Sequence, residues 1–146
     1  MNRHLRTTAL AVLAATLMLI QGTSRAQAQS SVPPRWEEVD FESLYDASRV
    51  ITVRGPITAF WHFPLGDRRT GVIVRLHVGG EFAHVYIGTK EFLDRNNLEL
   101  SINDYVTVTG NKALLRFRGL VVVADSIKKG DQLLRLRNDA GRPLWP

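Results

Sequence analysis

The chain has 146 residues, contains no cysteine and carries a formal net charge of +5. The absence of cysteine excludes disulfides, thiolate metal sites, a cysteine nucleophile and covalent c-type haem attachment. At this length a single domain can be stabilised by its hydrophobic core alone.

The first residues have the pattern of a secretory signal peptide. Arg3 and Arg6 precede the apolar run Ala9–Ile20, and the small-residue sequence Ala26–Ala28 follows it. The apolar run has twelve residues, well short of the roughly 20 that a membrane-spanning helix needs. The pattern predicts cleavage after Ala28, a periplasmic location and no transmembrane anchor in the mature protein.

Cleavage would also change the charge of the protein. Three arginines leave with the signal peptide, and the sixteen basic and fourteen acidic residues that remain give a net charge of +2. A generally basic nucleic-acid-binding protein is therefore excluded, and nucleic acid is not expected as a physiological partner. Residues 37–46 hold five carboxylates, whereas residues 112–137 hold seven basic side chains and two carboxylates. Pairing within the molecule and binding of an external partner are both compatible with this asymmetry.

The composition predicts three segments: a signal peptide (1–28), an N-terminal lead-in and strap (29–48) and a β-barrel domain (49–146). The strap is acidic with interspersed apolar residues, and it is compatible with one short helix or with an irregular segment that closes one end of the core. We predict that Trp36 and Trp145, near the two ends of the mature chain, pin those ends onto the barrel.

Alternating apolar and polar residues predict the strands of the barrel domain. The first strand is Arg49–Trp61, bent at Gly55-Pro56 because glycine marks a bulge or corner and proline cannot donate to a strand ladder. A turn-rich loop, His62–Gly71, follows it. Val72–Ile87 then predicts a hairpin around Gly79-Gly80, with three apolar pairs on its core side: Leu76 with Ala83, Val74 with Val85 and Val72 with Ile87.

A short helix and further strands follow the hairpin. Thr89 is expected to cap a helix that runs through Asn96. Tyr105–Thr109 is a strand that continues through Asn111–Phe117, and Gly119–Ile127 returns beside it. Gln132–Arg137 predicts one additional strand.

The segment Asn103–Gly110, with the sequence NDYVTVTG, resembles a pattern of exported bacterial OB-fold-like domains, an acidic turn followed by V-x-V-T-G. Val53–Phe60 and Gly141–Trp145 add to the resemblance, which covers residues 49–145. Together with the element order it implies an all-β protein with one short helix, an OB-fold-like five-stranded Greek-key barrel plus an extra C-terminal strand. Many proteins of this kind are uncharacterised, so the resemblance implies a fold more than a function.

Cations and rings gather where OB-folds usually bind ligands, on the outer face of strands 2 and 3 and on the loops between strands 1–2 and 4–5. Such side chains stack flat groups and hold anionic ones. The predicted ligand-binding residues are Arg75, His77, Phe82, His84 and Tyr86 on the hairpin, Trp61, Arg68 and Arg69 near the first loop, and Arg116, Phe117 and Arg118 near the second.

A structural interpretation of the hairpin residues stays open beside the functional one. Arginine and aromatic residues also form cross-strand pairs that stabilise a sheet, and the strap or the C-terminal strand could cover this side of the hairpin. A Zn²⁺ or Cu²⁺ site at His77 and His84 is a further alternative. Arg75, directly opposite His84, argues against a metal there.

Three functions are compatible with these residues. The first is an exported, non-enzymatic binding module for an anionic or aromatic ligand or an envelope partner protein. The second is a metal-handling or redox-accessory protein that uses His77 and His84. The third is a structural interaction protein that docks through its edge or its C-terminal tail. No enzyme is predicted, because the chain contains no G-x-S-x-G, no H-E-x-x-H and no glycine-rich phosphate loop.

Overall fold

The structure of the protein is a computed structural model that describes residues 35–116 and 118–146. The predicted signal peptide and Phe117 lie outside these residues. In the part of the chain that is described, no helix is both long enough and apolar enough to cross a membrane.

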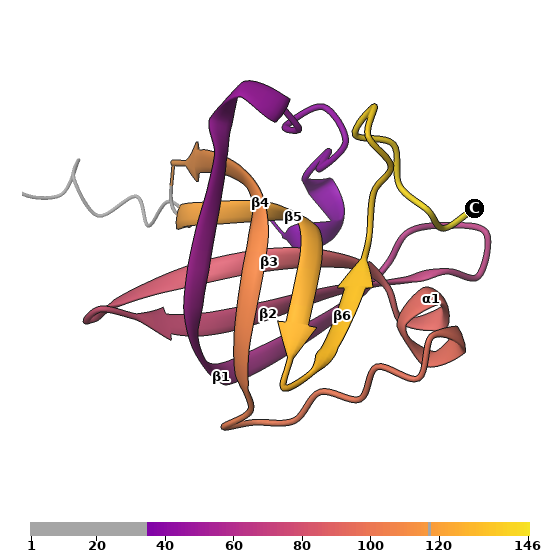
Figure 1. The fold of residues 1–146 in the computed structure, drawn as a ribbon. Helices are drawn as coiled ribbons and strands as arrows, with labels where there is room; N and C mark the ends of the chain where they lie inside the picture. Colours follow the sequence, from indigo (N-terminus) through magenta and orange to yellow (C-terminus); the bar gives the residue numbers. More distant parts are fainter. Residues whose placement is uncertain (1–34, 117) are drawn as a thin grey trace, which may run out of the picture. The chain divides into compact units, whose positions relative to one another are not determined.

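Five strands form a closed barrel (Figure 1). Their order in the sheet is β3-β2-β1-β4-β5, and a parallel pairing between β3 and β5 closes the ring. A sixth strand pairs with β5 outside the ring, and one short helix, α1, follows β3. The predicted fold class is confirmed. The elements are β1 (Val50–Pro64), β2 (Thr70–Val78), β3 (Glu81–Thr89), α1 (Lys90–Arg95), β4 (Tyr105–Leu115), β5 (Gly119–Lys129) and β6 (Gln132–Arg135).

Strand β1 belongs to both halves of the barrel because it bends near its centre. Residues 50–56 pair with β4, and residues 57–64 pair with β2. A Cβ atom on Gly55 would lie 2.1 Å from the carbonyl oxygen of His77, so the close approach of β1 and β2 requires glycine at this position. The predicted bend at Gly55-Pro56 is therefore confirmed.

Several predicted boundaries differ from those of the structure by two or three residues. The loop between β1 and β2 is shorter than His62–Gly71, because the ladder continues through the pairs of His62 with Val72 and of Pro64 with Thr70. Strand β6 ends at Arg135 rather than Arg137, since the next two amides turn to donate to the carbonyl oxygen of Asp125. The helix begins as predicted, with the Thr89 hydroxyl accepting a hydrogen bond from the amide of Phe92 at 3.2 Å.

The strap is irregular rather than helical. It contains two single turns of 3₁₀ helix, η1 (Trp36–Glu38) and η2 (Ala47–Arg49). The buried side chain of Asn111 on β4 holds the strap against the barrel through two hydrogen bonds. Its Oδ1 atom accepts from the amide of Asp46 at 2.8 Å, and its Nδ2 atom donates to the carbonyl oxygen of Leu44 at 2.6 Å. This arrangement decides between the two forms that the sequence left open.

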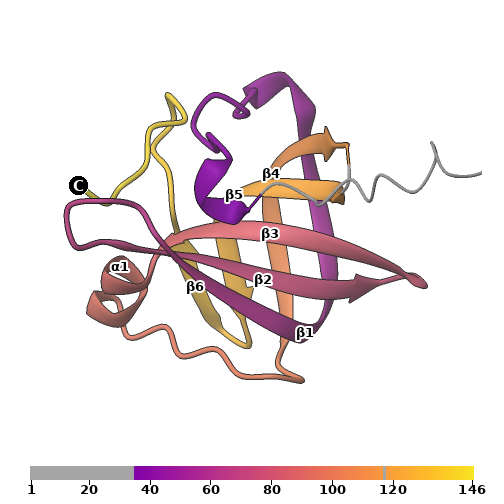
Figure 2. The same ribbon diagram turned by 180° about the vertical axis from the view of Figure 1, so that it is seen from behind.

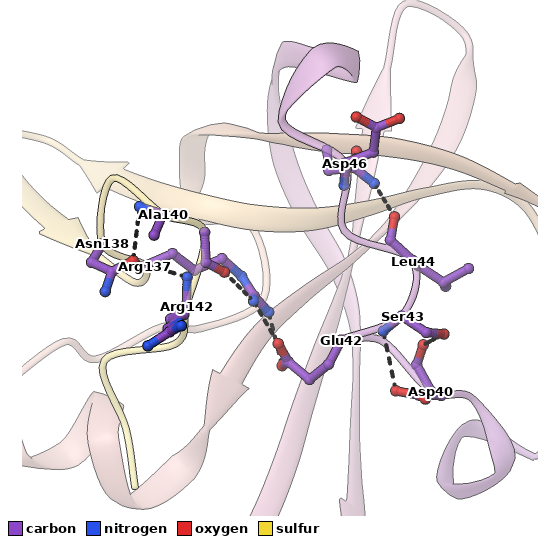
Figure 3. Close-up of polar contacts among 11 residues, drawn as sticks. Asp40, Glu42, Ser43, Leu44, Asp46, Arg137, Asn138, Ala140 and Arg142 are labelled. Atoms are coloured by element: carbon purple, nitrogen blue, oxygen red, sulfur yellow. Dashed lines mark hydrogen bonds and ion pairs between the residues drawn. The ribbon is translucent and has the colours of Figure 1, made fainter.

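An ion pair joins the strap to the segment after β6. The guanidinium of Arg137, only 1% exposed, donates to both carboxylate oxygens of Glu42, at 2.6 and 3.0 Å. Figure 3 shows the two side chains pointing toward each other. Arg137 also donates to the carbonyl of Gly141, and the rings of Tyr45 and Trp145 lie 5.0 and 5.5 Å from its Cζ atom. Part of the charge asymmetry is therefore satisfied within the molecule.

Glu42→Gln tests this pair, because it preserves the shape of the side chain and leaves the buried Arg137 without a charged partner. We expect the free energy of unfolding, measured by urea denaturation at neutral pH, to fall by about 2 kcal/mol. Arg135→Gln, which breaks an exposed pair with Asp139, is the matched control and should cost less than about 0.5 kcal/mol. Equal stability of Glu42→Gln and the unmodified protein would contradict a stabilising role for the pair.

Candidate binding face

The hairpin of β2 and β3 has most of the predicted register. Arg75 pairs with His84 and His77 with Phe82, as expected. The predicted pair of Val72 and Ile87 is wrong, because a bulge makes Val72 pair with Gly88. Gly88 has φ +106° and contacts the ring of Trp145, so the bulge depends on a backbone conformation that glycine adopts easily and on a distant side chain.

The part of the predicted face around Tyr86 is buried. Tyr86 is 3% exposed, because the Phe41 ring of the strap stacks on it at 4.2 Å and Trp145 packs edge-on at 6.1 Å. Loss of hydration raises the pKa of Tyr86 to about 12. The expectation that Tyr86 lies on an exposed binding surface is therefore wrong. The alternative, in which the strap covers this side of the hairpin, holds for this half.

His84 lies at the boundary between the buried and exposed halves. Its ring is 5.2 Å from the ring of Trp36 and 5.3 Å from that of Trp61. Partial burial, and then the positive charges of Arg118 and Arg75, hold the pKa of His84 below its usual value, although a hydrogen bond with the Arg118 backbone acts in the opposite direction. These surroundings therefore favour the neutral form of the imidazole.

The other half of the face is presented to solvent, and we call it the Arg75 face: Arg75, His77 and Phe82. Phe82 is 50% exposed, and the guanidinium carbon of Arg75 lies 4.5 Å from the centre of its ring. The Nε atom of Arg75 donates to the hydroxyl of Thr58 at 2.8 Å. The His77 ring lies 5.2 Å from that of Phe82. These contacts hold a cation and a ring side by side at the surface.

The structure does not bring the first-loop cations to this face. Arg68 and Arg69 precede β2, whereas His77 lies near its other end, so about 25 Å of strand separates them. Arg69 instead donates to the carbonyl oxygen of Pro146 at 2.6 Å. Trp61 lies within β1 rather than in the loop, and its ring is 6.0 Å from Arg75.

The second loop lies closer, on the side of His84. Arg118 covers the ring of Trp36, with 4.1 Å between its Cζ atom and the ring centre. Arg116 is exposed and helps to line a groove of about 380 Å³ between the strap and the β4–β5 hairpin. Trp36 and Trp145 are 5% and 7% exposed, so the prediction that they pin the two ends of the chain onto the barrel is confirmed. What sequence reasoning missed at this surface is the contact of Arg118 and His84 with the ring of Trp36. The size of Trp36 within an acidic segment indicated burial, but no local pattern indicated which strand it would cover.

The two histidines of the metal alternative have different neighbours. His77 lies against Phe82, and His84 packs between two tryptophan rings. Within residues 35–116 and 118–146, no group of three or more histidine, cysteine, aspartate or glutamate side chains is placed to hold a metal ion. The described part of the chain therefore places no third ligand beside His77 and His84 for a Zn²⁺ or Cu²⁺ ion.

The fold and this surface define a small β-barrel protein with a cation–aromatic face. The MamS/MamX magnetosome protein family matches residues 49–134, which comprise most of the barrel domain and nearly all of β6. The chain belongs to this family. No curated protein matches it. Glu42 and Arg137, which join the strap to the tail, both lie outside the matched residues.

The environment of His84 predicts a pH-dependent stability. Because its pKa in the folded protein lies below 6.5, the unfolded chain binds a proton that the folded protein does not, and stability rises with pH through that window. The free energy of unfolding should therefore fall between about pH 7.5 and about pH 5. His84→Asn should remove most of that fall in urea denaturation.

The exposed His77→Asn is the control and should retain the pH dependence of the unmodified protein. Asp46, Asp104 and Glu91 also have lowered pKa values, but their ordinary values are only 3.8, 3.8 and 4.5. The stability that these carboxylates contribute is therefore lost at a lower pH than the contribution of His84. A stability that changes equally with pH in His84→Asn and the unmodified protein would exclude His84 as the cause.

Proposed function

We propose that the protein is a non-enzymatic binding module of the magnetosome, exported by its N-terminal leader, that docks an acidic partner protein of the cell envelope on the Arg75 face. Membership of the MamS/MamX magnetosome protein family supports the association with the magnetosome. The leader pattern in residues 1–28 supports export and a periplasmic location. The observation that carries the binding proposal is the arrangement of Arg75 over the half-exposed Phe82.

Arg75 is oriented before any partner arrives. Its Nε atom donates a hydrogen bond to the hydroxyl of Thr58, whereas its two Nη groups form no hydrogen bond or ion pair with the described residues. A guanidinium in this state offers two parallel donors to a carboxylate. Because packing on Phe82 already restricts the side chain, little conformational entropy is lost on binding.

Phe82 supplies the apolar part of the interaction. Aromatic and arginine side chains contribute a large share of the binding energy at protein interfaces, and here the two are in contact. A partner that places a carboxylate at Arg75 and an apolar side chain on Phe82 would use both.

The geometry supports binding better than catalysis. Among the described residues, no carboxylate or hydroxyl forms a hydrogen bond with His77 that would orient it as a general base. The C-terminal tail is a weaker candidate for docking, because Arg137 and Trp145 are buried against the strap and barrel. Deletion of the tail would remove these buried side chains and destabilise the core, so a loss of binding in that variant would not identify the tail as an interface.

The double variant Arg75→Gln/Phe82→Ser tests the proposal. We expect cross-linking of the purified protein to a solubilised magnetosome and envelope fraction to yield about tenfold less of its specific partner than the unmodified protein does. Arg54→Gln/Tyr105→Ser, at an exposed arginine and an exposed ring on β1 and β4, is the matched control. Thermal unfolding should confirm that both variants are folded. Capture of the same proteins in equal amounts by both variants would refute the proposal.

A further inference from the structure

We propose that a cleft beside the second half of β1 binds an extended peptide segment of a partner protein that carries apolar and basic side chains. The segment would add a strand to the open edge of β1. We define the β1 cleft as the cavity of about 470 Å³ between β1, α1 and the connection that joins α1 to β4. This site is separate from the Arg75 face, and the proposal does not rest on the proposed function.

The edge of β1 that faces the cleft has no strand partner. Residues 50–56 of β1 pair with β4 on this edge, but β4 begins at Tyr105, opposite Pro56. Residues 57–64 pair with β2 on the opposite edge. In the described part of the chain, no strand continues the place of β4 along residues 58–64. The backbone groups that point to this edge can therefore pair with an added strand.

The connection between α1 and β4 is held away from this edge. It meets β1 at Ile57 through two backbone hydrogen bonds of 2.8 Å. Farther from β4, Lys129 on β5 donates to the carbonyl oxygen of Glu99 at 2.8 Å, and Gln132 on β6 donates to two carbonyl oxygens that follow α1. Figure 2 shows the connection running below the second half of β1. Because β5 and β6 hold the connection, the cleft exists before a ligand arrives, and little ordering is needed on binding.

The interior of the cleft is apolar. Val72, Leu93 and Leu98, each at most 5% exposed, form its floor. Phe60 and His62 form the β1 wall, and their rings are nearly parallel, with 5° between their planes and 6.4 Å between their centres. His62 pairs with Val72, so this wall lies on the core side of the sheet. An apolar side chain of an added strand would be buried against these groups and would extend the barrel core.

The rim of the cleft is acidic. It carries the exposed carboxylates of Asp94 and Glu99 together with one lysine, Lys90. Lys90 is already bound to Asp94 at 2.5 Å, whereas Glu99 forms no ion pair within residues 35–116 and 118–146. The carboxylate of Glu99 therefore remains for a cation of the partner, which favours a basic segment over an acidic one.

An extended peptide matches the cleft better than a small aromatic molecule does. A small molecule could occupy the apolar interior, but it would not use the open strand edge. A peptide strand pairs with that edge, and its alternate side chains point to the same side as Phe60 and His62. Because a strand also reaches along the rim, a basic side chain of the same segment can meet Glu99.

Titration with a synthetic peptide tests strand addition directly. The probe is acetyl-Lys-Val-Phe-Val-Lys-amide, and the backbone amide signals of the full chain are followed by NMR. We expect the shifts to gather at residues 58–63 and 98–101. A peptide with the same side chains and methylated backbone nitrogens is the matched control. It should bind about tenfold more weakly, because it cannot donate backbone hydrogen bonds to β1. Equal binding of the two peptides, or shifts centred on the Arg75 face, would overturn the proposal.

A variant that fills the cleft tests its location. Ser101 is exposed and lines the cleft, so Ser101→Trp should weaken binding of the peptide about tenfold by occupying the space for its side chains. Ile102→Trp, at the next residue, which is also exposed but does not line the cleft, is the matched control and should bind as the unmodified protein does. The amide spectra of the free variants report whether each is folded. Unchanged binding by folded Ser101→Trp would refute the proposal.

A charge exchange tests the role of the rim. Glu99→Lys should weaken binding of the peptide about fivefold and reduce its dependence on salt. Glu81→Lys, at an exposed carboxylate next to the turn of the β2–β3 hairpin, is the matched control and should leave binding unchanged. A peptide with glutamate in place of both lysines should prefer Glu99→Lys to the unmodified protein. Tighter binding of this acidic peptide to the unmodified protein would contradict the assignment of a basic segment.

The two proposals can fail independently. If Arg75→Gln/Phe82→Ser captures its envelope partner normally while Ser101→Trp loses the peptide, the cleft proposal stands and the function proposed for the Arg75 face does not. If Ser101→Trp binds the peptide normally while Arg75→Gln/Phe82→Ser loses its partner, the cleft proposal is wrong and the other stands. Shifts of the cleft amides with protein concentration alone would assign the cleft to a second copy of the chain and overturn the proposal.

Discussion

The ion pair between Glu42 and Arg137 joins two segments that are 95 residues apart in the sequence. Its bonds at 2.6 and 3.0 Å connect the strap, which precedes β1, to the tail, which follows β6. Because Arg137 is buried, its charge requires this partner and would be costly without it. Together with the two hydrogen bonds between Asn111 and the strap, this requirement fixes the position of the strap. With the strap in place, Trp36 and Phe41 cover the outer side of the β2–β3 hairpin.

The strap in turn determines where a partner can bind. Without the strap, the β2–β3 hairpin would expose five rings and cations on one side, as the alternation of its residues predicts. The strap buries Tyr86, partly covers His84 and leaves Arg75, His77 and Phe82 in contact with water. What is left is a short surface on which a hydroxyl and a ring fix one guanidinium.

The family match gives this arrangement a context. It covers residues 49–134, whereas the strap and most of the tail fall outside it. The barrel and the exposed residues of the Arg75 face are inside the matched range. The strap, which covers part of the predicted face, therefore lies outside the matched residues.

The sequence alone determined the elements whose signals are local. Alternation over a few residues predicted the strands, Gly79-Gly80 set most of the hairpin register, Thr89 marked the start of the helix, and Gly55-Pro56 marked the bend. Each depends on residues next to one another in the chain. The pattern of elements was sufficient for the barrel because few topologies accommodate that order.

Only the tertiary structure decided which side chains are accessible. The burial of Tyr86 depends on Phe41, the bulge at Gly88 on Trp145, and the pairing of Glu42 on an arginine 95 residues away. The separation of Arg68 and Arg69 from the Arg75 face likewise follows from the length of a strand within the closed barrel. Alternation tells which residues share a side of a strand. It carries no information about which remote segment packs on that side, because that contact is set by the fold of the whole chain.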